Sequence, residues 1–406
     1  MGNFNEKNKT NKNTNTNNSS IQHNNLIDKK YLKERINNYE LKIIKDEERC
    51  ITSFALLRNN KILLTLKGGI IKIYKFIHPG VGNTNKIQLI ELIRIEEEEY
   101  CFNYGIELKN GDLAVCSEDS TIKIIKIIFN NIDNNLEDNN IIKDKNESKY
   151  LIIQKINLVH EPLYIIKEFS NGELIIGGWE YILFFVKVPS INKYELINKI
   201  FIKDRTFSLI ELSIGEIIAS QCYSKSLTIY NLNTYEINII ENVESNENPN
   251  IICKYNNRND IVFVAYNKGI NIVSIINKSI IANIKTYEMI TCLCPFITHL
   301  NNNKNENENK IYCLLSGIKK KVYNQNVNYN YNFIQLGFSN INSNNKNKKI
   351  ETIIYEEKNK VHFHEIRAIE NILFSNNNIL NISKEEQLII SMGNEDKKLI
   401  IWEIKK

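Results

Sequence analysis

The sequence has little of what marks several common protein classes. None of its apolar runs approaches the roughly 20 residues that a membrane-spanning helix needs, so we expect no spanning segment. It contains no GxxxxGK[ST], GxGxxG or GxSxG motif, which argues against a phosphate-binding cradle. Alanine is scarce, which disfavours a helical solenoid.

Segregated charge and a disulfide framework are missing as well. The net charge is +5, but Lys+Arg (52) and Asp+Glu (47) are mixed along the chain, so we expect no nucleic-acid partner. The eight cysteines fall mostly inside expected strands, and no leader peptide is recognisable at the start. These observations favour a reducing compartment, the cytoplasm or alternatively the nucleus.

The apolar residues that are present are mainly Ile, Leu, Tyr and Phe. Hydrophobic residues make up 42% and charged residues 24%, as in ordinary globular proteins. Because β-branched and aromatic side chains suit a pleated, half-buried surface, the composition predicts an all-β protein.

A repeated pattern of strands and tight turns runs along the chain. In residues 105–128 one strand leads into Asn110-Gly111, which favours a type I′ hairpin turn, and two further strands follow. The same order recurs around Asn171-Gly172 and Ile214-Gly215. Further units begin near Cys50, Ile251, Met289 and His364. The count is seven, although the weak sixth unit leaves six to eight open.

The two ends of the pattern predict a closed ring. Residues 39–44 form a strand ahead of the first unit, and residues 398–404 form the last strand. If each unit is a four-stranded blade, the first strand completes the last blade and protects its edge. We expect an Asn-rich disordered tail with a short amphipathic helix in residues 1–38, and a seven-bladed β-propeller in residues 39–406.

The Asn-rich inserts indicate which face of such a ring is free to bind. They fall between first and second strands or between third and outer strands, at residues 130–148, 301–309, 340–348 and 376–385. In a propeller these loops share one face. We therefore expect the opposite face, with its short loops, to bind a partner; chance placement of the inserts is the alternative.

The last unit resembles the WD-repeat β-propeller family. His364 leads in, Ser391 and Asp396 flank a turn, and Trp402-Glu403 stands where the family has Trp-Asp. The resemblance implies that His364, Ser391, Asp396 and Trp402 form a structural network, and Asp119 lies in a similar turn. It also implies a non-enzymatic scaffold that binds proteins or peptides within a larger complex. The family's phosphoinositide signature Phe-Arg-Arg-Gly is absent, which disfavours lipid reading.

Binding candidates are the aromatic, Arg and His residues expected on the short-loop face, because Trp, Tyr and Arg dominate interface hot spots. They are Trp179, Arg205, Tyr100, Arg49, His160, Tyr223 and Tyr266. Trp179 ranks first, with core packing as its alternative. The acidic run at residues 96–99 reads as a solvated surface, or as a contact for a basic segment of a partner.

Two other functions stay open as alternatives. Met1-Gly2-Asn3 opens like an N-myristoylation substrate, although Glu6 replaces the usual Ser or Thr, so a membrane-associated trafficking adaptor is one. A propeller enzyme such as a hydrolase is the other, but we find no convergent catalytic residues and expect no cofactor.

Neither of two possible metal sites is convincing in the sequence. Cys292, Cys294, His299 and Cys313 have poor spacing for zinc, so we interpret these cysteines as buried thiols. His362 and His364 lack a third ligand.

Overall fold

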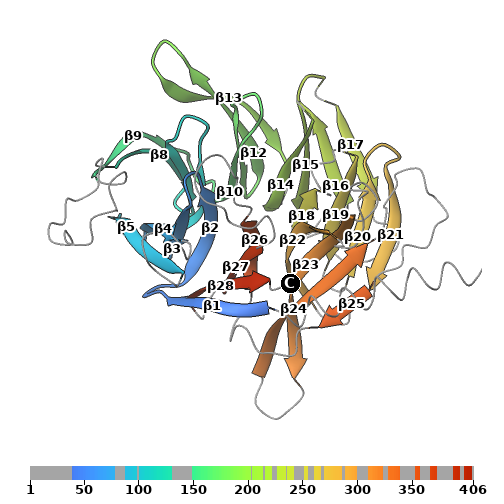
Figure 1. Ribbon diagram of the computed structural model, residues 1–406. Coiled ribbons are helices and arrows are strands. Elements are labelled where there is room, and N and C mark those ends of the chain that lie inside the picture. Colours follow the sequence, from blue (N-terminus) through green and yellow to red (C-terminus); the bar gives the residue numbers. More distant parts are fainter. Residues whose placement is uncertain are drawn as a thin grey trace, which may run out of the picture.

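In the computed structural model every regular element of the described residues is a β-strand (Figure 1). These residues are 39–77, 87–97, 100–129, 149–202, 204–213, 215–221, 226–234, 236–241, 251–254, 260–266, 269–285, 289–299, 310–322, 328–338, 353–356, 366–372, 387–393 and 397–404. Within them the strands form seven four-stranded antiparallel sheets.

Sheets 1 to 4 each pair four consecutive strands in chain order. Sheet 1 contains β2 (Ile51–Leu57), β3 (Lys61–Leu66), β4 (Ile70–Ile77) and β5 (Gln88–Glu96). Sheet 2 contains β6 (Phe102–Glu107), β7 (Leu113–Ser117), β8 (Thr121–Ile128) and β9 (Lys149–Asn157). Sheet 3 contains β10 (Leu163–Glu168), β11 (Leu174–Gly178), β12 (Tyr181–Val188) and β13 (Lys193–Phe201). Sheet 4 contains β14 (Thr206–Ser213), β15 (Glu216–Gln221), β16 (Ser226–Asn231) and β17 (Ile237–Glu241).

Sheets 5 and 6 repeat this arrangement, whereas sheet 7 takes its fourth strand from the other end of the described chain. Sheet 5 contains β18 (Ile251–Lys254), β19 (Ile261–Tyr266), β20 (Gly269–Ser274) and β21 (Ser279–Lys285). Sheet 6 contains β22 (Met289–His299), β23 (Lys310–Val322), β24 (Asn328–Phe338) and β25 (Ile353–Glu356). Sheet 7 contains β26 (Ile366–Ile372), β27 (Gln387–Gly393), β28 (Lys398–Ile404) and β1 (Tyr39–Asp46).

The predicted pairing of the first and last strands is confirmed. β1 runs antiparallel to β28, from Tyr39 opposite Ile404 to Asp46 opposite Lys398 (Figure 1). The backbone N–H of Glu47 continues this contact by donating to the carbonyl of Lys397, at 2.8 Å. Main-chain hydrogen bonds therefore join segments at opposite ends of the described chain.

The first strands of successive sheets contact one another in a closed sequence. β2 contacts β6, β6 contacts β10, and the series continues through β14, β18, β22 and β26 until β26 contacts β2. Such a cyclic order places the first strands on the inside and the fourth strands on the outside.

Burial explains which strands lie inside. Every residue of β3, β11, β19 and β20 is buried, so these strands read as continuous apolar runs, as expected for strands covered on both faces. The outer strands β5 and β13 expose many of their residues and keep a partly alternating pattern. Burial therefore decreases from these covered strands to the outer strands, and the hydrophobic core lies between neighbouring sheets.

The tight turns follow the predicted positions but not every predicted type. At Asn110-Gly111 only Gly111 has positive φ (92°), so the type I′ prediction is wrong. Leu108 N donates to Asp112 O at 2.8 Å, which closes a three-residue loop with Gly in the left-handed position. Two consecutive positive φ values, as in a type I′ turn, occur instead at Asn59 (58°) and Asn60 (55°).

Two ion pairs with a buried lysine recur at equivalent places in sheets 1 and 2. Lys72, the third residue of β4, lies with its Nζ 2.8 Å from an Oε of Glu47, and the Glu47 side chain is fully buried (0% exposed). Lys123, the third residue of β8, lies with its Nζ 2.7 Å from an Oε of Glu97. Each glutamate precedes the first strand of the sheet that supplies the lysine, so the pair fixes the chain where it enters that sheet.

The four predicted inserts, the tail with its expected helix, and Gly2 lie outside the described residues. The strands that flank each insert do have the expected order: first and second strands flank residues 301–309 and 376–385, while third and outer strands flank residues 130–148 and 340–348.

Candidate functional site

The connections from outer to first strands and the turns from second to third strands lie at the same end of every antiparallel sheet. We call this side the entry face; its described residues in the first four sheets are 47–50, 67–69, 97, 100–101, 118–120, 158–162, 179–180, 202 and 204–205. Five of the predicted binding residues belong to it, namely Arg49, Tyr100, His160, Trp179 and Arg205. Tyr100 is 56% exposed and Trp179 is 40% exposed.

Two other predicted binding residues are not available in the described structure. Tyr266 was expected to be exposed, and this is wrong, because it is buried at the end of β19 (3% exposed). Burial raises the pKa of Tyr266 to about 12. The second strand of a sheet is covered on both faces, which explains the error. Tyr223 lies outside the described residues.

The structure brings two of the predicted binding residues, Trp179 and Arg205, together. The guanidinium carbon of Arg205 lies 4.1 Å from the centroid of the Trp179 ring and 5.9 Å from that of Tyr164. Tyr164 also contacts Phe207, with ring centroids 6.3 Å apart in an edge-to-face arrangement. We call Tyr164, Trp179, Arg205 and Phe207 the aromatic–arginine cluster. It lies where sheets 3 and 4 meet, and sequence reasoning missed Tyr164 and Phe207.

Two glycines allow this close meeting of sheets 3 and 4. A Cβ on Gly177 would lie 2.7 Å from Cβ of Thr206, so only glycine lets β11 approach the start of β14 so closely. A Cβ on Gly178 would lie 2.2 Å from Oε1 of Glu161. That same oxygen accepts hydrogen bonds from the backbone N–H groups of Glu180 (2.9 Å) and Tyr181 (3.1 Å). The buried Glu161 carboxylate therefore fixes the turn that carries Trp179.

Tyr164 and Phe207 share a position that recurs in other sheets. Each is the second residue of a first strand, where the pairing register shifts. At the equivalent position in sheet 2, Asn103 Nδ2 donates to the carbonyl of Leu163 in the next sheet at 2.7 Å. If the repeats had been aligned at the second residue of each first strand, the two aromatic residues would have been identified from the sequence.

Among the described residues, the side chain of Arg205 forms no salt bridge. Its Nε is buried and has no hydrogen-bond partner. The neighbouring Asp204 carboxylate is engaged, since it accepts a hydrogen bond from the Arg205 backbone N–H at 2.7 Å. By contrast, Arg58 pairs with Glu107, and Arg94 pairs with Glu48 and Glu96. The guanidinium stacks on the Trp179 ring, and within the described residues no carboxylate forms a salt bridge with it.

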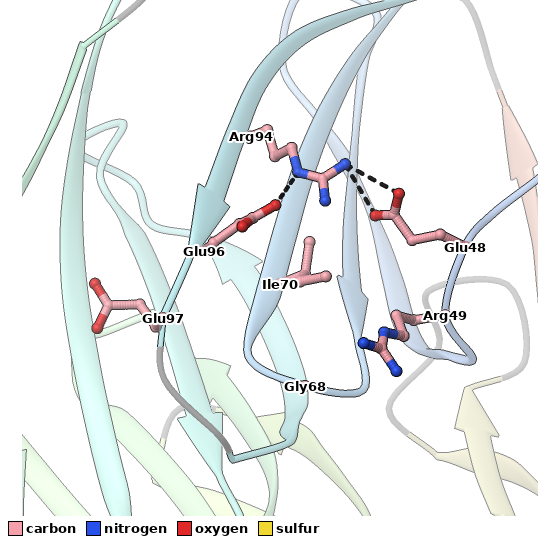
Figure 2. Close-up of a pocket in the computed structure, with 7 residues that line it drawn as sticks. All are labelled: Glu48, Arg49, Gly68, Ile70, Arg94, Glu96 and Glu97. Carbon is pink, nitrogen blue, oxygen red and sulfur yellow. Dashed lines mark hydrogen bonds and ion pairs between the residues drawn. The ribbon is translucent and has the colours of Figure 1, made fainter.

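A pocket of about 630 Å³ opens on the same face beside sheet 1. It is lined by Glu48, Arg49, Gly68, Ile70, Arg94, Glu96 and Glu97. Figure 2 shows Arg94 between Glu48 and Glu96, while Arg49 lies near the turn that holds Gly68. The hydrogen bond that Glu48 accepts from Arg94 raises the pKa of that guanidinium. Burial alone would raise the pKa of Glu48, but hydrogen bonds from Arg94 and Lys72 lower it.

The pocket carboxylates are matched to cations, and this limits their chemistry. Glu48 and Glu96 pair with Arg94, and Glu97 pairs with Lys123. Hydrogen bonds from Arg94 and Lys72 lower the pKa of Glu48, and a carboxylate held ionised in this way is a poor general acid at neutral pH. The arrangement suits a polar contact surface, with Arg49 exposed at its edge.

The residues assigned to the structural network are described only in part. The Asp119 carboxylate accepts hydrogen bonds from the backbone N–H (3.0 Å) and the hydroxyl (2.6 Å) of Thr121. Ser391 is buried in β27, and the backbone of Trp402 pairs with Leu41 of β1. His364, Asp396 and the Trp402 side chain lie outside the described residues.

A metal centre finds no support in the described part of the chain, where no group of three or more His, Cys, Asp or Glu side chains could hold an ion. Cys292 and Cys294 are buried in β22. The side chains of His299, Cys313, His362 and His364 lie outside the described residues. No helix in the described segments has the length and apolar character that crossing a bilayer requires.

Comparison with known proteins identifies the kind of fold. No protein-family model matches the chain, and no curated protein matches it in sequence. A chain in the crystal structure of the mitotic checkpoint complex is similar in structure, with a TM-score of 0.59 and 9% identity, covering 90% of this chain and 95% of that chain. The similarity supports an all-β, propeller-like fold. Because 849 chains of solved structures match, the fold alone selects no function.

Proposed function

We propose that the protein is a non-enzymatic scaffold, a closed seven-bladed propeller that presents its entry face to protein or peptide partners within a larger complex. The cyclic contacts of the first strands and the pairing of β1 with β28 support the ring. The observation that carries the binding role is the aromatic–arginine cluster, in which Trp179 and Phe207 are 40% and 41% exposed.

The physical reason is that such residues bind by burial on a rigid support. Exposed aromatic rings and arginine give large contact area and directional donors, and they lose little freedom on binding when neighbouring groups already fix them. Glu161, Gly177 and Gly178 provide that support here. The similarity to a chain from a multiprotein crystal structure favours membership of a complex, and nothing of that complex's pathway is transferred. We place the protein in the cytoplasm or nucleus, without a cofactor.

Quantitative affinity purification from the source cell tests this function. Wild type should recover a defined set of proteins, and Trp179→Ala and Arg205→Ala should lose part of that set. Phe201→Ala is the matched aromatic control, because Phe201 is 55% exposed on the outer strand β13. Lys126→Ala is the matched charge control, because Lys126 is exposed on β8. Equal recovery of every protein by all four variants would refute the proposed surface.

A further inference from the structure

We infer that the aromatic–arginine cluster binds a carboxylate side chain of a partner peptide, an Asp or Glu that stands next to an apolar residue. This inference rests on the proposed scaffold function and names the chemistry that the cluster selects. Its basis is the geometry around Arg205, together with the exposure of the rings around it.

The guanidinium is oriented before any partner arrives. It stacks on Trp179 at 4.1 Å, and the turn that carries Trp179 is held by the buried Glu161 carboxylate. A planar guanidinium whose orientation is fixed can donate two parallel hydrogen bonds to a carboxylate with a small loss of side-chain entropy. Lysine could not replace it, because an ammonium neither stacks as a plane nor donates in a fork.

The charge of Arg205 is left for a partner to balance. Its Nε is buried and has no hydrogen-bond partner, while the residue as a whole is partly exposed. Within the described residues the nearby carboxylates are committed elsewhere, Asp204 to a backbone N–H and Glu161 to the turn of Trp179. One cation in the described cluster balances one carboxylate. A doubly charged phosphate group would call for more cations than the described cluster holds.

The rings define the apolar half of the ligand. Trp179 and Phe207 each leave about two fifths of their surface exposed (40% and 41%), and Tyr164 bridges them with centroid distances of 6.4 Å and 6.3 Å. An apolar side chain beside the ligand carboxylate would cover these rings, and burial would strengthen the ion pair by removing water from it.

Selection from a phage-displayed library of random heptapeptides on the full chain tests the inference. We expect enriched peptides to carry Asp or Glu beside an apolar residue. Changing that acid to its amide in a synthetic peptide should weaken binding roughly 10- to 100-fold, the range for a lost hydrogen bond to a charged group. Arg205→Gln should abolish the preference for the acid, and Arg205→Lys should restore it only in part. Lys126→Gln should leave it unchanged.

The outcomes separate this inference from the proposed function. Enriched peptides without an acid whose binding still requires Trp179 would refute the carboxylate and leave the scaffold surface standing. A phosphoserine replacement that binds more than tenfold tighter than Asp would also overturn it in favour of a phosphopeptide. Binding that is unaffected by both Trp179→Ala and Arg205→Gln would remove the surface itself. Circular dichroism of each variant confirms folding.

Discussion

Replacing Lys72 by methionine tests the buried ion pair at the entry to sheet 1. Lys72 Nζ lies 2.8 Å from Glu47, 3.2 Å from Glu48 and 3.6 Å from Glu91, and only 6% of the lysine side chain is exposed. Without the ammonium, the fully buried Glu47 carboxylate (0% exposed) keeps the Tyr74 hydroxyl, at 2.7 Å, as its remaining described side-chain partner. Breaking one side of a buried pair costs about 3–5 kcal/mol, and we expect that loss here.

The equivalent pair in sheet 2 supplies the matched comparison. Lys123 is as buried as Lys72, with 7% of its side chain exposed, but its partner Glu97 is 25% exposed and keeps contact with water. Lys123→Met should therefore cost less, about 1.5–3 kcal/mol, the range for a hydrogen bond to a charged group. The two variants remove the same atoms at the same position of the repeat and differ in the hydration of the carboxylate left behind.

Urea unfolding at neutral pH, followed by circular dichroism, measures both free energies. The double variant Glu47→Gln/Lys72→Met should recover more than half of the loss, because it removes the stranded charge and leaves an amide. A cost for Lys72→Met below about 1 kcal/mol, or no larger than that of Lys123→Met, would refute the reasoning that burial of Glu47 controls the energy of this site.

Two further results are expected. Burial and the hydrogen bond to Glu47 raise the pKa of Tyr74; burial alone would lower the pKa of Lys72, but Glu47 and its acidic neighbours raise it. Both pKa values are higher in the folded chain than in the unfolded chain, so the protonated Lys72 and Tyr74 stabilise the fold. This contribution to the free energy of unfolding is complete below about pH 10 and is lost as the pH rises further. Urea midpoints measured from pH 8 to 11 should therefore fall at the alkaline end. Glu40→Cys/Glu403→Cys should form an intramolecular disulfide, detected by mass spectrometry, because these residues are direct partners across β1 and β28.

Each of these two results has a control that can contradict it. A Lys72→Met/Tyr74→Phe variant should lose less stability between pH 8 and 11 than wild type, and an equal or greater loss would contradict the assignment. Glu40→Cys/Lys398→Cys places the two thiols at opposite ends of the strand pair and should not cross-link. If this mismatched pair forms a disulfide, or if the matched pair does not, the register between β1 and β28 differs from the one described.

The order of the strands could be read from the sequence because its causes are local, and the pairing of β1 with β28 could be read because each of these strands lacked a partner in its own unit. Glycines with positive φ, at Gly111 (92°), Gly172 (85°) and Gly215 (84°), mark the hairpins that the Asn-Gly and Ile-Gly pairs predicted. Short apolar runs between turn residues, such as residues 174–176 after Asn171-Gly172, favour strands covered on both faces, and β11 is buried along its whole length. The turn at Asn110 was misassigned because a three-residue loop and a two-residue loop use the same Asn-Gly pair.

The aromatic–arginine cluster could be predicted only as separate residues. Trp179 and Arg205 were chosen by residue type and by their places at strand ends, but their contact depends on how closely β11 approaches Thr206, which is a property of packing between sheets. Tyr266 was misplaced for the same reason. The end of β19 would be exposed if its sheet stood alone, but side chains of the neighbouring sheet cover Tyr266.

The pairing of β1 with β28 also sets an order of events during synthesis. β1 leaves the ribosome first among the described strands, yet its partner is made last, so it must wait with an unpaired edge while nearly all of the intervening chain is translated. At about 5–20 residues per second this wait is roughly 20–70 s. During that time the unpaired edge of β1 is open to wrong pairing, and a chaperone that covers it would protect the nascent chain.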